Sequence, residues 1–291
     1  MPETLEITVR PAQPADLEAG ARLLYEAFKS IADQRGFEPD FPSVEIASSM
    51  GKIFLNHPQI SGVAAEVDGA LAGLAFVSKR NEILAVGPIV VDPQLQNHGI
   101  GRVLMRKILE HTKDARGVRL VQDTANPLSL ALYESLGFNV KEPLFLLYGN
   151  PKGEPSDGYN IRPMRESDLA ACNELCRRVH SFDRGGELAD AMAHFGAVVL
   201  IRRGRIVAYA SAPSLWFMNH GVAEADKDLK ALLMHAGLIK EAPVSLLVPG
   251  RNNDFFRWCL SAGLRIAKPM TLMSMGFYQE PKAPWYPSVE Y

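Results

Sequence analysis

The sequence predicts an α/β fold in two tandem domains, each built on a mixed, mostly antiparallel sheet flanked by helices. Its 291 residues are enough for two domains with separate cores. An internal repeat relates the two halves. In the first half, short strand-like segments alternate with segments of helical periodicity, and Asp68-Gly69 is a strong hairpin signal. Because hairpins join antiparallel strands, a doubly wound parallel sheet is less favoured.

The elements of the first half follow from this alternation and from turn and cap residues. Asp16 is suited to cap a helix after the first strand, and apolar residues such as Ile100 and Leu104 show helical spacing after a glycine-containing turn. The expected order is a strand at 5–10, a helix at 16–28, a helical stretch ending before 56, strands at 62–67, 71–78 and 82–91, a helix at 99–113, a strand at 118–121, a helix at 126–136 and a strand at 141–148.

Two pairs of matching segments reveal the repeat. Residues 7–17 (ITVRPAQPADL) match residues 159–169 (YNIRPMRESDL) at a constant offset of 152. Residues 126–138 (NPLSLALYESLGF) match residues 252–264 (NNDFFRWCLSAGL) at an offset of 126, so the second copy is shorter between these landmarks. Glycines and prolines between 148 and 159 indicate a linker. We therefore place the domain boundary near residue 150, with domains at 1–150 and 151–291.

Composition and charge exclude several classes of function. The net charge is −2, with 22% charged and 47% hydrophobic residues, and no basic stripe points to nucleic acid. No apolar run approaches the roughly 20 residues of a membrane span. Residues 1–10 lack the pattern of a signal peptide, and three cysteines, an odd number, argue against a disulfide scaffold. We expect a cytoplasmic protein without nucleic-acid or membrane partners.

Cys172, Cys176 and His180 recur at four-residue spacing, which would place them on one face of a helix. A closed zinc site needs a fourth ligand from elsewhere, and the sequence contains no second Cys/His cluster. A buried helix face is the favoured interpretation, so we expect no metal.

The most informative segment is residues 91–102, VDPQLQNHGIGR. A strand ends at its first residue, a proline turns the chain, and a helix opens at the glycines. The first turn of a helix carries unpaired N–H groups and the positive end of the macrodipole, which together bind a pyrophosphate. Gly99 and Gly101 lack a Cβ that would hold the phosphates away from these amides. The segment therefore predicts a phosphate-binding loop.

The spacing distinguishes between types of phosphate loop. A dinucleotide-binding fingerprint needs a third glycine where this chain has Leu104, and a P-loop needs a Gly-Lys-Ser/Thr triplet that does not follow. The pattern Q-x-x-G-x-G after a strand and proline resembles the pyrophosphate loop of the GNAT superfamily of N-acetyltransferases. The downstream pattern N-x-x-S-x-x-L-Y-x-x-x-G-F of that family is matched by Asn126, Ser129, Leu132, Tyr133, Gly137 and Phe138. The resemblance covers about 145 residues of the first half.

The resemblance implies a fold in which acetyl-CoA lies in a splay between the fourth and fifth strands. The backbone of Ile89, Val90 and Val91 would then hold the pantetheine arm and the thioester. Asn126 would contact the CoA arm, and Tyr133 would donate a proton to the departing thiolate. The pyrophosphate would be held by Gln96, Asn97, His98, Gly99, Ile100, Gly101 and Arg102. His98 would act through its backbone. For two of these residues a structural role stays open as an alternative. Tyr133 could be an aromatic residue of the core, and Arg102 could be a solvated residue at the start of a helix.

An amine must lose its proton before it attacks, so a general base is useful. Glu82 begins the strand that ends at Val91, where many family members place a carboxylate. It also lies beside Lys79, Arg80 and Asn81 and fits a solvated turn equally well. Asp123 is a weaker alternative.

The second half lacks the loop. Glu224, Asp226 and Asp228 stand where the glycines would be, and these carboxylates would repel a pyrophosphate. Cys259 takes the place of Tyr133 and is expected to be a small buried residue. We expect the second half to form one wall of the acceptor pocket. The aromatic tail at 281–291 is expected to cover that pocket or the domain junction.

The favoured function is an N-acetyltransferase that moves acetyl from acetyl-CoA to a primary amine, on a small molecule or a peptide, by direct attack in a ternary complex. A non-catalytic acyl-CoA sensor of the same fold, and a CoA-free scaffold in which the repeat serves homodimerisation, are the alternatives.

Overall fold

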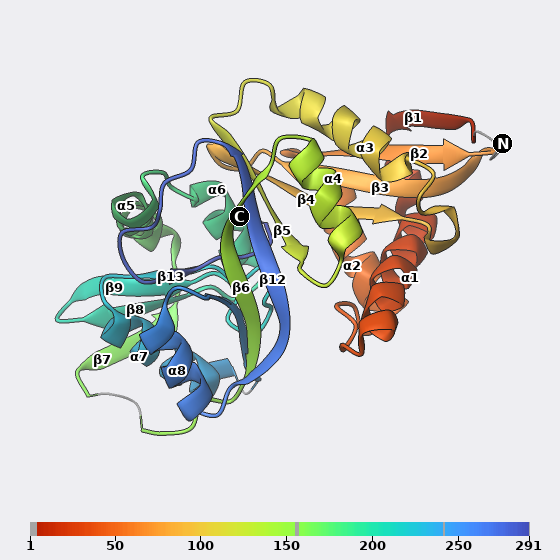
Figure 1. Cartoon of the computed structure of the whole chain (residues 1–291). Coiled ribbons are helices and arrows are strands. Elements are labelled where there is room, and N and C mark those ends of the chain that lie inside the picture. The colour runs from red at the N-terminus through yellow and green to blue at the C-terminus, as the bar shows by residue number, and fades with distance from the viewer. Residues whose placement is uncertain (1–4, 155–156, 241, 291) are drawn as a thin grey trace.

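The computed structural model describes residues 5–154, 157–240 and 242–290, and its strands form two sheets (Figure 1). Three of the sequence-based expectations fall partly outside these residues: the signal-peptide test at 1–4, the linker at 155–156 and the last residue of the tail, Tyr291. No helix within the described ranges is long and apolar enough to cross a membrane.

The first half contains the expected elements in the expected order. Its strands and helices are β1 (Ile7–Pro11), α1 (Leu17–Arg35), α2 (Val44–Asn56), β2 (Ile60–Val67), β3 (Ala70–Ser78), β4 (Ile83–Val91), α3 (Ile100–Leu109), β5 (Gly117–Asp123), α4 (Pro127–Ser135) and β6 (Asn139–Gly149). The β2–β3 hairpin turns at Asp68 and Gly69, both with positive φ. Helix α1 runs a further two turns beyond the expected end and stops at Gly36, whose φ of 71° is the left-handed conformation that glycine accepts.

The second half repeats this order and adds a short strand at its end. They are β7 (Tyr159–Pro163), α5 (Leu169–His180), α6 (Gly185–His194), β8 (Val198–Arg202), β9 (Arg205–Ala210), β10 (Gly221–Ala223), α7 (Asp226–Lys240), β11 (Val244–Pro249), α8 (Asn253–Ser261), β12 (Arg265–Gly276) and β13 (Trp285–Tyr286). The repeat extends to side-chain pairing: Arg10 binds Asp16 at the start of the first half, and Arg162 binds Asp168 at the start of the second.

The two halves share one sheet, which the repeat alone does not predict. Its strand order is β1-β2-β3-β4-β5-β12-β6-β11. Strand β12 from the second half lies between β5 and β6 of the first, with Leu272 opposite Val121 on one side and Glu142 on the other. Figure 1 shows β6 and β12 side by side across the middle of the molecule. Residue 150 thus remains our proposed division of the chain, while the packing of the two halves is continuous.

Alternation along the strands builds a core on each face of the first-half sheet. Val63 and Ala75 face α3 and α4, whereas Ala64 and Leu74 face α1 and α2. In the second half, the second sheet, with order β13-β10-β9-β8-β7, is covered in the same way by α5 and α6 on one face and by α7 and α8 on the other.

The parallel pairing of β4 with β5 stops after three residues. Ile83, Leu84 and Ala85 of β4 pair with residues 117–119 of β5, and no pair follows toward Val91. On its other side β4 stays paired with β3 as far as Val91. The two strands therefore separate toward their carboxyl ends, which confirms the expected splay between the fourth and fifth strands.

Candidate active site

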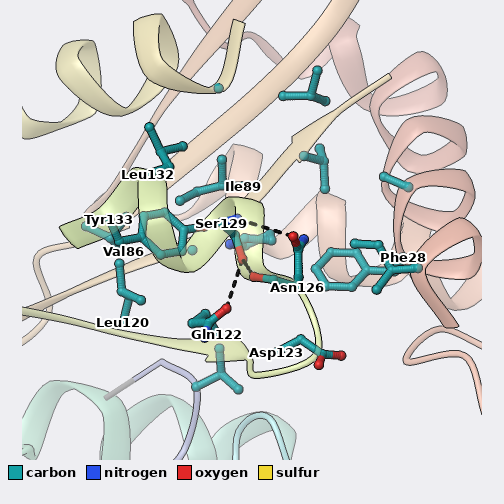
Figure 2. A pocket seen from close by; sticks show the side chains of 18 of the residues that line it. Phe28, Val86, Ile89, Leu120, Gln122, Asp123, Asn126, Ser129, Leu132 and Tyr133 are labelled. Atoms are coloured by element: carbon teal, nitrogen blue, oxygen red, sulfur yellow. Dashed lines mark hydrogen bonds between the residues drawn. The ribbon is translucent and has the colours of Figure 1, made fainter. Parts of the chain in front are cut away.

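A cavity of about 420 Å³ occupies the splay. One side is made by β4 and β5, and another by the starts of α3 and α4. The remaining sides are made by α1, α2, the segment between them and five residues of the second half. In Figure 2, Tyr133 extends toward the cavity from α4 and Phe28 from α1, with Asp123 below the gap between these helices.

The start of α3 presents bare backbone to this cavity. Gly99 is the residue before the helix, with a φ of 88°, and a Cβ added to it would meet no protein atom within 4 Å. Asn97 also has a positive φ, of 66°. The unpaired N–H groups of the first helical turn therefore face open space, as anion binding requires. A Cβ on Gly101 would lie 3.5 Å from Leu132, an ordinary contact, so at this position the protein itself does not require glycine.

Six of the seven residues expected in the phosphate loop line the cavity: Gln96, Asn97, Gly99, Ile100, Gly101 and Arg102. His98 is exposed and does not line it. Its Nδ1 atom lies 2.9 Å from the carbonyl oxygen of Gln96, so the ring folds back onto its own loop. The side chain of His98 therefore takes no part in lining the cavity.

The edge of β4 that faces β5 is open beside the cavity. Ile89, Val90 and Val91 all line the cavity and pair only with β3. Backbone N–H and C=O groups that lose a strand partner need another hydrogen-bonding group. An extended ligand with amide groups can supply it, which is the interaction expected for a pantetheine arm.

Tyr133 lies on α4 with its ring edge against Phe138, at 6.3 Å between centroids, and it lines the cavity. Burial raises the pKa of its phenol well above the ordinary value, so the hydroxyl keeps its proton at neutral pH. Within the described part of the chain, this hydroxyl makes no hydrogen bond. It is therefore a neutral donor, available to a ligand.

Asn126 caps α4. Its Oδ1 atom accepts a hydrogen bond from the backbone N–H of Ser129 at 3.2 Å, and the Ser129 hydroxyl donates to Gln122 at 2.8 Å (Figure 2). Asn126 also lines the cavity. Capping occupies the carbonyl side of its amide, which leaves the NH₂ group to donate to a ligand.

Glu82 does not lie where the sequence-based expectation placed it. It precedes β4 at the end where β4 and β5 are still paired, outside the residues that line the cavity. Its exposed carboxylate forms an ion pair with Arg116. The physical reason is the direction of the splay, which opens toward Val91, several residues further along the strand. Glu82 as the general base is therefore wrong in this structure.

Three other carboxylates line the cavity: Asp40, Asp123 and Glu290. The Lys268 ammonium binds Asp40 at 2.7 Å and Asp123 at 3.3 Å. Burial raises the pKa of Asp40, and the nearby Lys268 opposes that shift. Asp123 was a weak sequence candidate. Asp40 and Glu290 were missed because they carry no motif and reach the cavity only through the tertiary fold.

The second half contributes a wall of the cavity through Trp216, Phe217, Met270, Val289 and Glu290. The last two belong to the tail, which β13 anchors by pairing with β10. The second half thus lines the cavity, as expected, and two residues of the tail take part in that lining.

At the corresponding helix start of the second half, acidic side chains stand in the first turn and are paired with other side chains. Asp228 is fully buried and bound by Arg202 at 3.0 Å and by the Tyr159 hydroxyl at 2.8 Å. Glu224 forms an ion pair with Arg205. Cys259 is buried, and burial raises the pKa of its thiol to about 12. Carboxylates thus occupy the start of α7, where α3 has glycines.

The helix face with Cys172, Cys176 and His180 is buried in the second-half core. Burial raises the pKa of Cys172 to about 12 and that of Cys176 to about 11. Within the described residues, no group of three or more His, Cys, Asp or Glu side chains is arranged to hold a metal ion.

Comparison with known sequences matches residues 22–138 to the acetyltransferase (GNAT) family. The ribosomal protein bS18-alanine N-acetyltransferase of Escherichia coli K12 is 30% identical over 110 residues, which cover 37% of this chain and 70% of that protein. Other relatives are matched over a smaller share of their own length, 27–55%.

Comparison with solved structures extends over the whole chain. A structure from Pyrococcus horikoshii has a TM-score of 0.78 at 18% identity and covers 100% of this chain and 98% of its own. A tandem GNAT protein from the clavulanic acid biosynthesis pathway has a TM-score of 0.59 at 13% identity, with 96% and 99% covered. At these identities the likeness is one of fold, and it includes the tandem arrangement.

Proposed function

This chain belongs to the acetyltransferase (GNAT) family, and we propose that it transfers acetyl from acetyl-CoA to a primary amine by direct attack in a ternary complex. One observation carries the proposal. The bare helix start at Gly99, the open edge of β4 and the unbonded hydroxyl of Tyr133 all face the same cavity.

The residues present fit acetyl-CoA. A Cβ at Gly99 would project into open space, so the cradle at the start of α3 is free for a pyrophosphate. From there the open edge of β4 offers the backbone groups of Ile89 and Val91, which have no strand partner on that side, while those of Val90 turn to β3. Asn126 lines the same cavity from the start of α4. The cavity therefore offers partners both for the phosphates at one end of such a ligand and for the amides along its length.

Tyr133 is the proposed general acid. Amine attack on a thioester expels a thiolate whose ordinary pKa is about 8.5. The buried phenol of Tyr133 is protonated and has no competing partner among the described residues. It can therefore donate to the departing sulfur. A backbone N–H of the open β4 edge would stabilise the negative charge that develops on the carbonyl oxygen.

Two measurements test the proposal. Calorimetry with CoA and acetyl-CoA asks whether the cavity binds them, and thiol release over a panel of amines asks whether acetyl is transferred. We expect submillimolar to micromolar binding and release that depends on an amine. Binding without release for every amine would favour an acyl-CoA sensor, and failure to bind CoA would favour a CoA-free scaffold.

A further inference from the structure

The part of the cavity away from the α3 start is aromatic. Phe28 of α1 and Phe41 meet edge to face, with ring centroids 5.4 Å apart, and Phe41 lies 6.0 Å from Phe217 of the second half. All three rings line the cavity. The second half therefore completes an apolar surface that the first half begins. Such a surface recognises an apolar body by desolvation.

Glu290 adjoins this surface. The preceding residue, Val289, donates its backbone N–H to the carbonyl oxygen of Phe217 at 2.9 Å, which fixes the tail against the aromatic group. The Glu290 carboxylate lines the cavity, and its Oε2 atom accepts a hydrogen bond from Arg80 at 3.1 Å. Its other oxygen, Oε1, has no hydrogen-bond partner within the described residues. The carboxylate is thus held by one oxygen and open at the other.

The charged and titratable groups connected to Glu290, directly or through one another, come from both halves: Arg80 after β3, His57 after α2, Arg184 before α6, Glu187 and Asp190 on α6, and His220 before β10. Arg80 binds both Glu290 and Asp190, while Arg184 binds Glu187. Burial, with the nearby Glu187, raises the pKa of Glu290 to about 7, although Arg80 opposes this shift. A carboxylate that titrates near neutrality is suited to accept a proton.

The other two carboxylates in the cavity are less free. Asp40 and Asp123 share one ammonium, that of Lys268. Lys268 in turn lies 5.5 Å from the ring of Trp216. Both oxygens of Asp40 accept hydrogen bonds from Lys268. The two oxygens of Asp123 accept from the Ala125 N–H and from Lys268. Glu290, by contrast, accepts a hydrogen bond at one oxygen only among the described residues, from Arg80.

We propose that the acceptor is a primary amine on an apolar body, that this body packs on Phe28, Phe41 and Phe217, and that Glu290 takes the proton from its nitrogen. This inference rests on the proposed acetyl transfer.

The protons balance as follows. The ammonium of the acceptor loses one proton to the Glu290 carboxylate, which later releases it to solvent. The neutral nitrogen forms a bond with the thioester carbon, and the carbon–sulfur bond breaks. The thiolate takes the proton of Tyr133, and the second proton lost by the nitrogen restores the phenol through solvent. The products are the amide, free CoA and one proton in solution.

The pH dependence of turnover tests the role of Glu290. In the wild type, kcat/KM for 2-phenylethylamine is expected to rise with pH up to about 7, since protonated Glu290 accepts nothing. Glu290→Gln keeps an oxygen for Arg80 but accepts no proton. We expect it to lower kcat/KM at pH 7 by about 100-fold. Its rising limb should shift toward the pKa of the free amine, about 10. Glu290→Asp should recover part of the lost kcat/KM, and its kcat/KM should again rise with pH near neutrality.

Asp190→Asn is the matched control, because it also removes a carboxylate from Arg80 but lies outside the cavity. In Asp190→Asn, kcat/KM should rise over the same pH range as in the wild type. An unchanged limb in Glu290→Gln, or the same shift in Asp190→Asn, would overturn the role of Glu290.

An amine panel tests the acceptor class. We expect kcat/KM for 2-phenylethylamine to exceed that for spermidine or lysine by at least about 10-fold, since the latter carry extra charges into an apolar surface. Phe28→Ala should raise KM for 2-phenylethylamine while CoA affinity by calorimetry stays unchanged. Preference for spermidine or lysine overturns the inference and leaves acetyl transfer intact. If the protein did not bind CoA, the proposed acetyl transfer would be rejected, and the inference about the acceptor would fall with it.

Discussion

The two halves of the chain share a fold and differ in chemistry at matching positions. Asn126 and Asn252 both cap a helix, accepting from the backbone N–H three residues on. Gly137 and Gly263 both follow that helix with a φ of 97°. The residues that shape the backbone are therefore retained. On the same helix, Tyr133 of the first half is matched by the inert thiol of Cys259 in the second.

The helix after the fourth strand differs in the same way. In the first half, α3 starts at Gly99 with its N–H groups facing a cavity. In the second, α7 starts with Asp226, and Asp228 in its first turn is bound by Arg202. The start of α3 is thus open to an anion, whereas the carboxylates at the start of α7 would repel one. One copy of the fold keeps a bare helix start, and in the other Asp228 is held in an ion pair with Arg202.

The largest expected effect is on CoA affinity. Gly99→Asp places a Cβ and a negative charge at the bare start of α3, where φ is 88°. We expect CoA affinity to fall at least about 100-fold, or about 2.7 kcal/mol, by calorimetry. Gly204→Asp is the control, because Gly204 also has a positive φ, of 75°, in a second-half turn with open space around it. Gly204→Asp should introduce similar backbone strain and leave the affinity for CoA unchanged. If Gly99→Asp and Gly204→Asp bound CoA equally well, the start of α3 would not be the phosphate-binding site.

The next effect is on turnover. Tyr133→Phe removes the proposed proton donor and should lower kcat about 100-fold with CoA affinity unchanged. Its melting temperature should change little, since the hydroxyl makes no hydrogen bond within the described residues. At the matching position, Cys259→Ala should lower the melting temperature slightly and leave kcat unchanged. If Tyr133→Phe kept the wild-type kcat, the two positions would be equivalent core residues.

The matched ion pairs should contribute similarly to stability. Arg10 and Arg162 lower the pKa of Asp16 and Asp168 by hydrogen bonding. A lowered folded-state pKa stabilises the protein above the unfolded value, and this stabilisation is lost as the pH falls through the folded value. Asp16→Asn and Asp168→Asn should each cost about 1–2 kcal/mol at pH 7, with the difference from wild type shrinking as the pH falls through the lowered folded-state pKa of the carboxyl. Urea unfolding across this range measures it. If only one of the two substitutions lowered the free energy of unfolding, the two ion pairs would not be equivalent.

An effect of similar size is expected at the helix ends. Gly137→Ala and Gly263→Ala force an L-residue into φ 97°, and each should cost about 1–2 kcal/mol. The nearest protein atoms lie 3.6 Å or more from an added Cβ at both positions, so backbone strain dominates in each. Thermal unfolding should show similar losses. A large loss at Gly137 alone would indicate a further role for that residue in the first half.

Much of the first half could be predicted because its signals are local. The Asp68-Gly69 turn, the Asn126 cap and the glycine at the start of α3 act within a few residues of themselves. Boundaries were less accurate where tertiary packing extends an element, as in α1, which continues to Arg35 while packing on α2. The error at Glu82 had another cause. The direction in which β4 and β5 separate depends on strand pairing, which sequence spacing does not specify.

By itself, the sequence determined the family, the tandem repeat and the phosphate loop, because each depends on residue identity at short range or on a repeated pattern. Only the tertiary structure decided that β12 lies between β5 and β6, and that Trp216, Phe217 and Glu290 reach a cavity of the first half. Glu290 and Arg80 lie 210 positions apart in the chain and are joined by a hydrogen bond of 3.1 Å. Contacts of this kind arise when distant segments bury apolar surface together, and no local pattern records which segments will meet.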